Sequence, residues 1–131
     1  MYVLDTNTVI HFFKASGKVV ERMLTTPPTE LSVPAIVVFE LEVGIAKSVQ
    51  PNKRRQQLED LLAVVTVLPF DRVSASTAAQ IRAGLEKIGQ PIGPFDTLIA
   101  GTALAHHATL VTRNTREFER VSGLSIVNWY D

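Results

Sequence analysis

The sequence predicts an α/β protein, a three-layer α/β/α sandwich around a central, mainly parallel sheet of four to five strands. Short β-prone apolar runs alternate along the chain with longer segments of helical periodicity. Parallel neighbours in a sheet need a crossover connection, which a helix usually supplies, so helices are expected on both faces. The length of 131 residues fits one domain, residues 1-131.

The first half of the chain is expected to begin with a strand and to continue mainly as helices. Thr6 to Thr8 offer capping side chains at the start of the first helix, and Pro34 can open a later helix because a first-turn residue needs no N–H partner. The expected elements are a strand at 2–4, helices ending at 13 and spanning 19–24, a strand at 31–33 and a helix from about 35 to 48.

The second half repeats the alternation at similar spacing. Pro51 opens a helix, and the Gly- and Pro-rich segment 89–94 predicts a loop before the next apolar helix. The expected elements are a helix from 51 to about 65, a strand at 67–70, helices at 74–88 and 96–107, and strands at 110–111 and 125–127.

Composition limits the chemistry. The chain has no cysteine, so disulfides and thiolate metal sites are excluded, and a metal would be held by oxygen or imidazole ligands. Thirteen basic residues balance thirteen acidic ones, so bulk charge alone would not bind nucleic acid. Asp5 interrupts the N-terminal apolar run and no apolar stretch reaches the roughly 20 residues of a membrane span, so a cytoplasmic location without membrane contact is expected.

Acidic residues occur where a parallel sheet of this kind places its functional crevice, beyond the carboxyl ends of its strands. Asp5 directly follows the first predicted strand and can ligate a cation or cap the next helix. Asp96 begins a helix rich in alanine and glycine, whose tight packing would fix its first turn, and it too can cap or ligate. After the strand at 110–111, Thr112, Asn114 and Glu117 reach the same edge, although taken alone this segment is better explained as an ordinary polar turn.

Glu40 lies in the middle of a helix so apolar that most of its circumference must be buried. A carboxylate in such surroundings needs a cation or a proton. Glu42 lies about 200° away around the helix, so the two glutamates face opposite ways, and spacing alone does not choose between them. We take Glu40 as the site residue and Glu42 as solvated.

Four segments together resemble the PIN-domain ribonucleases, and among them the VapC-type toxins of type II toxin–antitoxin systems. In the family's order, the matching segments are Leu4 to Asn7, Phe39 to Gly44, Pro91 to Ala100 and Thr112 to Phe118. The resemblance implies a PIN-like fold in which Asp5, Glu40 and Asp96 bind Mg²⁺ or Mn²⁺. The fourth family position commonly holds Asp and here holds Asn114, which adds no negative charge, so a tightly held second metal is in doubt.

The same resemblance implies a metal-dependent endoribonuclease that hydrolyses RNA, with transfer RNA as the expected substrate, and thereby inhibits translation. It implies a VapB-type antitoxin partner, a homodimer, and contact with DNA only through the antitoxin. Exposed cations, among them Arg113 and Arg116, would hold RNA phosphates near the acidic centre or would serve only as solvated surface charge. His11, His106 and His107 show no ligand spacing with the acids, so surface or packing roles are expected.

Two other functions compete with this one. Asp5-Thr6-Asn7-Thr8 looks a little like the opening motif of haloacid-dehalogenase-type phosphatases, with Asp5 as nucleophile, but Asn7 cannot act as the second acid. A catalytically silent PIN-like module that only binds a partner is the other alternative, against which the retention of all three acids argues.

Overall fold

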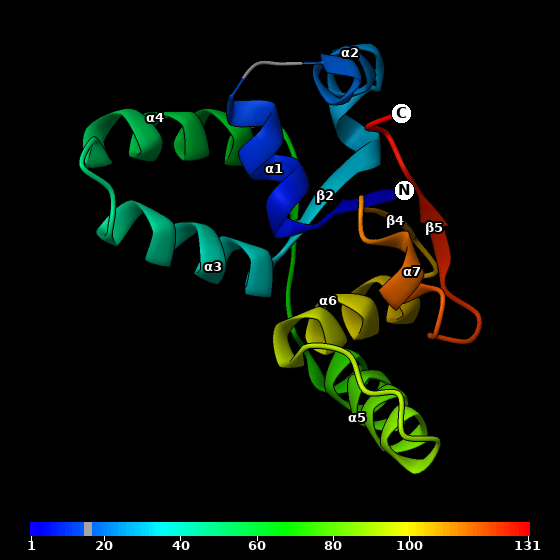
Figure 1. The fold of residues 1–131 in the computed structure, drawn as a ribbon. Coiled ribbons are helices and arrows are strands. Elements are labelled where there is room, and N and C mark those ends of the chain that lie inside the picture. The colour runs from blue at the N-terminus through cyan, green and yellow to red at the C-terminus, as the bar shows by residue number, and fades with distance from the viewer. Residues whose placement is uncertain (15–16) are drawn as a thin grey trace.

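The computed structural model describes residues 1–14 and 17–131, in which a five-stranded sheet lies between helices (Figure 1). The strands are β1 (Tyr2–Leu4), β2 (Leu31–Pro34), β3 (Thr66–Leu68), β4 (Thr109–Val111) and β5 (Ser125–Val127). The helices are α1 (Thr6–Phe13), α2 (Gly17–Thr25), the 3₁₀ helix η1 (Pro28–Glu30), α3 (Ala35–Ala46), α4 (Pro51–Leu62), α5 (Arg72–Lys87), α6 (Pro94–Ala105) and α7 (Thr115–Phe118).

The sheet has the strand order β3-β2-β1-β4-β5, and every neighbouring pair is parallel. The first strand is therefore central, with Tyr2 in register with Leu31 on one side and with Thr109 on the other. The carboxyl ends of these parallel strands therefore lie at one edge of the sheet, which brings together the residues that follow β1, β2 and β4. The predicted parallel sheet is confirmed.

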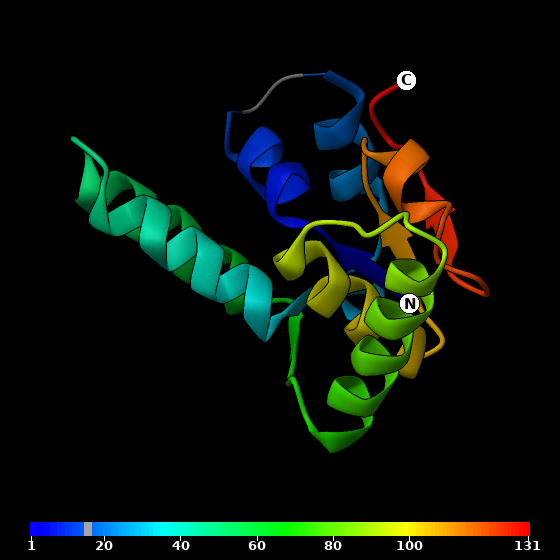
Figure 2. The same ribbon diagram turned by 60° about the horizontal axis from the view of Figure 1, so that its bottom comes forward.

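Helices cover both faces of the sheet. Helices α1 and α2 lie on one side and α5 and α6 on the other, whereas α3 and α4 form a hairpin that projects from the body of the molecule (Figures 1 and 2). Strand residues such as Val3, Val33 and Leu110 are completely buried, as expected for a parallel sheet covered twice. None of the helices within 1–14 and 17–131 is both long and apolar enough to cross a membrane.

Helices α5 and α6 approach each other almost backbone to backbone. A Cβ built on Gly101 of α6 would lie 2.5 Å from the Cβ of Ala78 and 2.8 Å from its Cα, so only glycine fits here. Gly101 is itself buried. The predicted tight packing of this helix is confirmed, and it fixes the direction in which α6 presents its first turn.

The element boundaries differ slightly from the predicted ones. Helix α6 begins at Pro94 with Gly93 at the N-cap, two residues before the predicted start, because proline at the first helical position loses no hydrogen bond. Asp96 is therefore in the first turn and is not the cap. Strand β3 ends at Leu68, before Pro69, although residues 67–70 were predicted, and α3 ends at Ala46.

Candidate active site at the carboxyl edge of the sheet

Asp5 lies at the junction of β1 and α1 and is 7% exposed. Its Oδ1 accepts a hydrogen bond of 2.8 Å from the backbone N of Thr8, so Asp5 is the N-cap of α1. Its backbone N donates to the carbonyl of Val111 at the end of β4, which ties two neighbouring strand ends together. Within the described part of the chain Oδ2 accepts no hydrogen bond, so Asp5 can cap the helix and still offer one oxygen to the site.

Glu40 projects from α3 and is partly buried. The hydroxyl of Thr6 donates a hydrogen bond of 2.6 Å to its Oε1. The sequence suggested Thr6 as a capping residue, but Asp5 makes the cap and Thr6 instead holds Glu40. Sequence reasoning missed this contact because the two residues are 34 positions apart and only the fold brings them together.

Glu42 faces the opposite way, toward α4. It forms a two-pronged ion pair with Arg55, with oxygen to nitrogen distances of 2.7 and 2.8 Å. The hydrogen bond and charge of Arg55 hold the pKa of the Glu42 carboxyl below its usual value. The two glutamates thus separate as the helical geometry predicted, and Glu40 is the one on the side of Thr6.

Asp96 lies in the first turn of α6, half buried, and accepts no side-chain hydrogen bond from the residues described. The pKa of its carboxyl is raised to about 6, first by burial and then by three neighbouring negative charges. In order of decreasing effect these neighbours are Glu117, Asp5 and Glu40. Burial and the negative charges of these three carboxylates together account for the high pKa of Asp96, as expected where carboxylates from four separate elements lie in one region.

Asn114 precedes the short helix α7, and its side-chain amide donates a hydrogen bond to the carboxylate of Glu117. Its backbone N donates to Thr112 Oγ1 at 3.0 Å, which closes a turn just after β4. Thr112 is completely buried, so its role is to shape the turn. Glu117 has the largest charge effect on Asp96, which puts it in the acidic cluster, whereas the sequence had left its inward position open.

The cluster is strongly negative but is not a closed ligand set. Across 1–14 and 17–131 no group of three or more acidic or histidine side chains lies close enough, as placed, to hold a metal ion. Ion pairs in the same residues use Arg55 and Arg82 as their cations and include none of the cluster's carboxylates. Oxygen donors of this kind suit hard cations such as Mg²⁺, and small rotations of the carboxylates would have to complete the site.

Comparisons with known proteins show the family of this chain. The family model described as PIN domain matches residues 2–124. The chain belongs to the PIN-domain family. Among PIN-domain relatives, it is 36% identical to the tRNA(fMet)-specific endonuclease VapC of Shigella flexneri, over 98% of this chain and 97% of that protein. It is also 36% identical to ribonuclease VapC2 of Haemophilus influenzae, with the same coverage. The predicted VapC-type relationship is confirmed, and the phosphatase alternative is set aside.

Solved PIN-domain structures match over nearly the whole chain. The DNA-bound VapBC complex of Salmonella typhimurium aligns with a TM-score of 0.92 at 36% identity, covering 98% of this chain and 97% of the other. VapBC2 of Rickettsia felis, bound to a DNA fragment from its promoter, aligns with a TM-score of 0.90 at 31% identity and 98% coverage of both chains. The predicted three-layer fold is therefore confirmed.

Proposed function

We propose that this chain is a single-domain, metal-dependent endoribonuclease and the toxin of a toxin–antitoxin pair. The observation that supports it best is the gathering of Asp5, Glu40 and Glu117 around Asp96, whose pKa is raised to about 6, first by burial and then by these negative charges. These groups come from the start of α1, the middle of α3, the first turn of α6 and the short helix α7, and burying several like charges together is costly unless a ligand offsets them. Asp5, Glu40 and Asp96 are the proposed metal ligands, and Asn114 completes the catalytic set.

Magnesium or manganese fits this donor set because all its members offer oxygen, and the ion pairs among residues 1–14 and 17–131 include none of its carboxylates. When bound, the ion supplies the Lewis acidity that lowers the pKa of water and offsets charge on the scissile phosphate. Glu40, held by Thr6, is oriented to accept a proton from the water that attacks phosphorus. The P–O bond to the leaving oxygen then breaks, which leaves two shorter RNA chains.

The proposed substrate is RNA, and transfer RNA is its expected class. Relatives that share 36% and 34% of their residues with this chain carry the name tRNA(fMet)-specific endonuclease. Cleavage of such an RNA would inhibit translation, and it would place the enzyme in the cytoplasm. Mapping of cleaved RNA ends from cells that express the chain would test the substrate directly.

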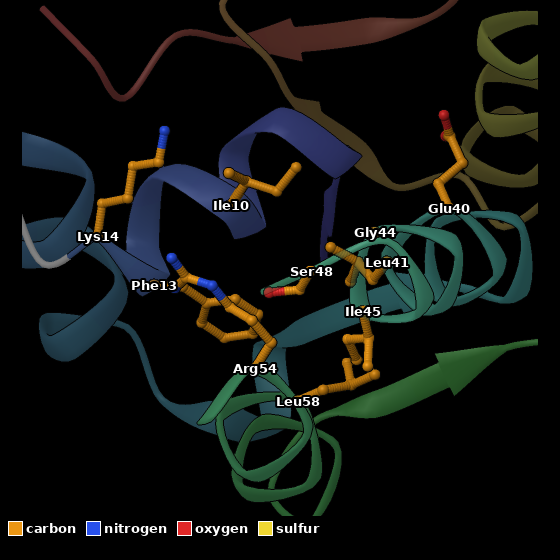
Figure 3. Close-up of a pocket in the computed structure, with 10 residues that line it drawn as sticks. All are labelled: Ile10, Phe13, Lys14, Glu40, Leu41, Gly44, Ile45, Ser48, Arg54 and Leu58. Carbon is orange, nitrogen blue, oxygen red and sulfur yellow. The ribbon is translucent and has the colours of Figure 1, made fainter. Parts of the chain in front are cut away.

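An antitoxin of the VapB type is the proposed protein partner. An apolar groove between α1 and the α3–α4 hairpin is available to it, with Glu40 at one end (Figure 3). The groove is lined by Ile10, Phe13, Lys14, Glu40, Leu41, Gly44, Ile45, Ser48, Arg54 and Leu58. An apolar helix or strand laid along it would cover Glu40 and block the site. Any contact with DNA is expected through the antitoxin, as the VapBC neighbours are DNA-bound complexes.

A homodimer is also expected. Phe39 and Phe95 are 51% and 43% exposed, their rings lie 5.7 Å apart, and Val43 extends this apolar patch along α3. Burial of such a patch against a second copy would remove apolar area from water. Light scattering of the chain alone and with its antitoxin tests both partners, and a strict monomer that ignores the antitoxin would contradict them.

The decisive experiment measures RNA cleavage with Mg²⁺, with excess chelator, and with Asp96→Asn or Asp5→Asn. We expect the chelator and each variant to lower the rate by about 100-fold or more, because each removes charge that holds the cation. Asp60→Asn, an exposed carboxylate on α4, is the matched control and should cleave like the wild type. Equal cleavage by all of these proteins would contradict the proposal and attribute the activity to a contaminant.

A catalytically silent binding module is the second candidate, favoured by the open arrangement of the carboxylates across 1–14 and 17–131. Such a module would bind the antitoxin but would not cleave RNA with either Mg²⁺ or Mn²⁺. It would also show no rise in melting temperature when these ions are added at pH 7. A metal-induced rise that Asp96→Asn abolishes would exclude it.

A further inference from the structure

A polar cavity adjoins the acidic cluster on the side of α1. Its lining comes from α1, from the turn after β4 and from the segment after β5. The lining residues are Asp5, Asn7, Ile10, His11, Lys14, Arg113, Asn114 and Tyr130. Because Asp5 and Asn114 also belong to the proposed active site, a chain bound at the scissile position would pass directly into this cavity.

Two cations, Arg113 and Lys14, line the cavity together with Asp5. Arg113 and Lys14 are exposed, and the ion pairs found within 1–14 and 17–131 include neither of them. The cavity therefore offers positive charge next to a cluster of carboxylates. A bound anion would satisfy both cations, and in a nucleic acid that anion is a backbone phosphate.

Arg113 is held against an aromatic ring. Its guanidinium carbon lies 5.4 Å from the centre of the Tyr130 ring, within the range of a cation–π contact. The Tyr130 hydroxyl donates a 3.3 Å hydrogen bond to Thr8 Oγ1, and its backbone N donates to Asn128 Oδ1 at 2.7 Å. The ring is thus fixed from two sides, and it fixes the arginine in turn.

A second ring completes the cavity wall. The imidazole of His11 lies 4.8 Å from the Tyr130 ring at an angle of 59°. The packing role expected for His11 is thus observed, but it lies in a cavity that also contains Asp5. Aromatic rings beside unpaired cations form the combination with which proteins bind single-stranded nucleic acid, through base contacts and phosphate contacts together.

We propose that this cavity is a subsite for the nucleotide next to the scissile phosphate of single-stranded RNA. Arg113 and Lys14 bind the phosphate of that nucleotide, and its base packs on the His11 and Tyr130 pair. Tyr130 acts as a positioning residue for Arg113. This inference rests on the proposed function, because it takes RNA as the substrate of the neighbouring carboxylates.

The test measures binding in a protein that cannot cut its probe. In the Asp96→Asn background and with chelator present, fluorescence anisotropy follows a fluorescein-labelled, eight-nucleotide single-stranded RNA at several salt concentrations. We expect Arg113→Ala to weaken binding about tenfold and to reduce the slope of log affinity against log salt by about 1. Arg72→Ala on α5, an exposed arginine outside the cavity, should leave both unchanged.

Variants of Tyr130 distinguish a role in positioning Arg113 from a general effect on folding. Tyr130→Phe retains the ring beneath Arg113 and should bind the probe within about twofold of its parent, whereas Tyr130→Ala should lose most of what Arg113→Ala loses. The double variant of Arg113→Ala with Tyr130→Ala should lose more than Arg113→Ala alone, because the base contact is lost as well, but less than the two single losses added together. Melting temperatures identify any variant that fails to fold, and Arg113→Gln then replaces Arg113→Ala.

Equal affinity and equal salt slope for Arg113→Ala and Arg72→Ala would overturn the subsite. That result is independent of the cleavage test, which depends on Asp96. Cleavage that persists in Asp96→Asn would overturn the proposed active site but would leave the binding measurement intact.

Discussion

Helices α5 and α6 and helices α3 and α4 form two pairs that present their carboxylates in different ways. In the first pair the backbones nearly touch at Gly101 and Ala78, so packing alone fixes Asp96 at the start of α6. The second pair projects from the body and leaves apolar side chains such as Phe39 exposed, so Glu40 depends on a hydrogen bond from Thr6. One acid is held by packing and the other by a single polar contact.

The contrast predicts that the largest stability effect lies at the packed pair. Gly101→Ala places a Cβ 2.5 Å from the Cβ of Ala78, so the helices must separate, and we expect a loss of about 3 kcal/mol of unfolding free energy. Urea unfolding measures it. Gly84→Ala on α5 is the control, because a Cβ there meets nothing within 4 Å and should stabilise the helix by about 0.5–1 kcal/mol. Similar losses in both variants would contradict the account.

For the projecting helices α3 and α4, we expect a substitution that frees Glu40 to lower activity rather than stability. Thr6→Val removes the hydrogen bond to Glu40, so we expect kcat to fall about tenfold with KM nearly unchanged. The unfolding free energy should change by no more than about 1.5 kcal/mol, the net contribution of one hydrogen bond. Thr6→Ser retains the hydroxyl and should restore kcat. If Thr6→Ser is as slow as Thr6→Val, the hydroxyl does not position Glu40.

The raised pKa of Asp96 predicts that the stability of the folded protein depends on pH. The folded pKa of about 6 exceeds the unfolded value of about 3.9, so the folded protein binds the proton more tightly. Stability contributed by this group is therefore greatest below pH 4 and falls as the pH rises to 6. Melting temperatures in chelator should show this fall, and Asp96→Asn should reduce it. Identical pH curves for the two proteins would show that Asp96 titrates normally.

The smallest effect is expected at the ion pair that joins α3 to α4. Glu42 and Arg55 are 42% and 45% exposed, so water and salt screen their attraction. Glu42→Gln should lower the melting temperature by no more than about 3 °C and leave RNA cleavage unchanged. A loss of RNA cleavage in Glu42→Gln would show that Glu42, and not Glu40, is the site residue.

Local patterns were sufficient to predict the sheet, because the periodicity of strands and helices and the positions of prolines can be recognised within short segments of sequence. Pro51 opens α4 as expected, and the strands at Tyr2–Leu4 and Ser125–Val127 have the predicted bounds. Helical geometry also separated Glu40 from Glu42 correctly. The contacts that hold the site were not predictable, since Thr6 meets Glu40 and Thr8 meets Tyr130 only after distant segments pack together. The predicted helix starts at Asp96, which could cap or ligate, whereas in the structure Pro94 starts α6 and Gly93 is the N-cap.

The central position of β1 means that its two neighbours close loops of very different length. Tyr2 pairs with Leu31 on one side and with Thr109 on the other, and closure of the longer loop costs more chain entropy. A partially folded chain can thus build the β3-β2-β1 half with Asp5 and Glu40 in place while Asp96 and Asn114 are still distant. Such an intermediate has no complete acidic cluster, so under the proposed function a partly folded copy of this chain would not cleave RNA until its two halves had joined.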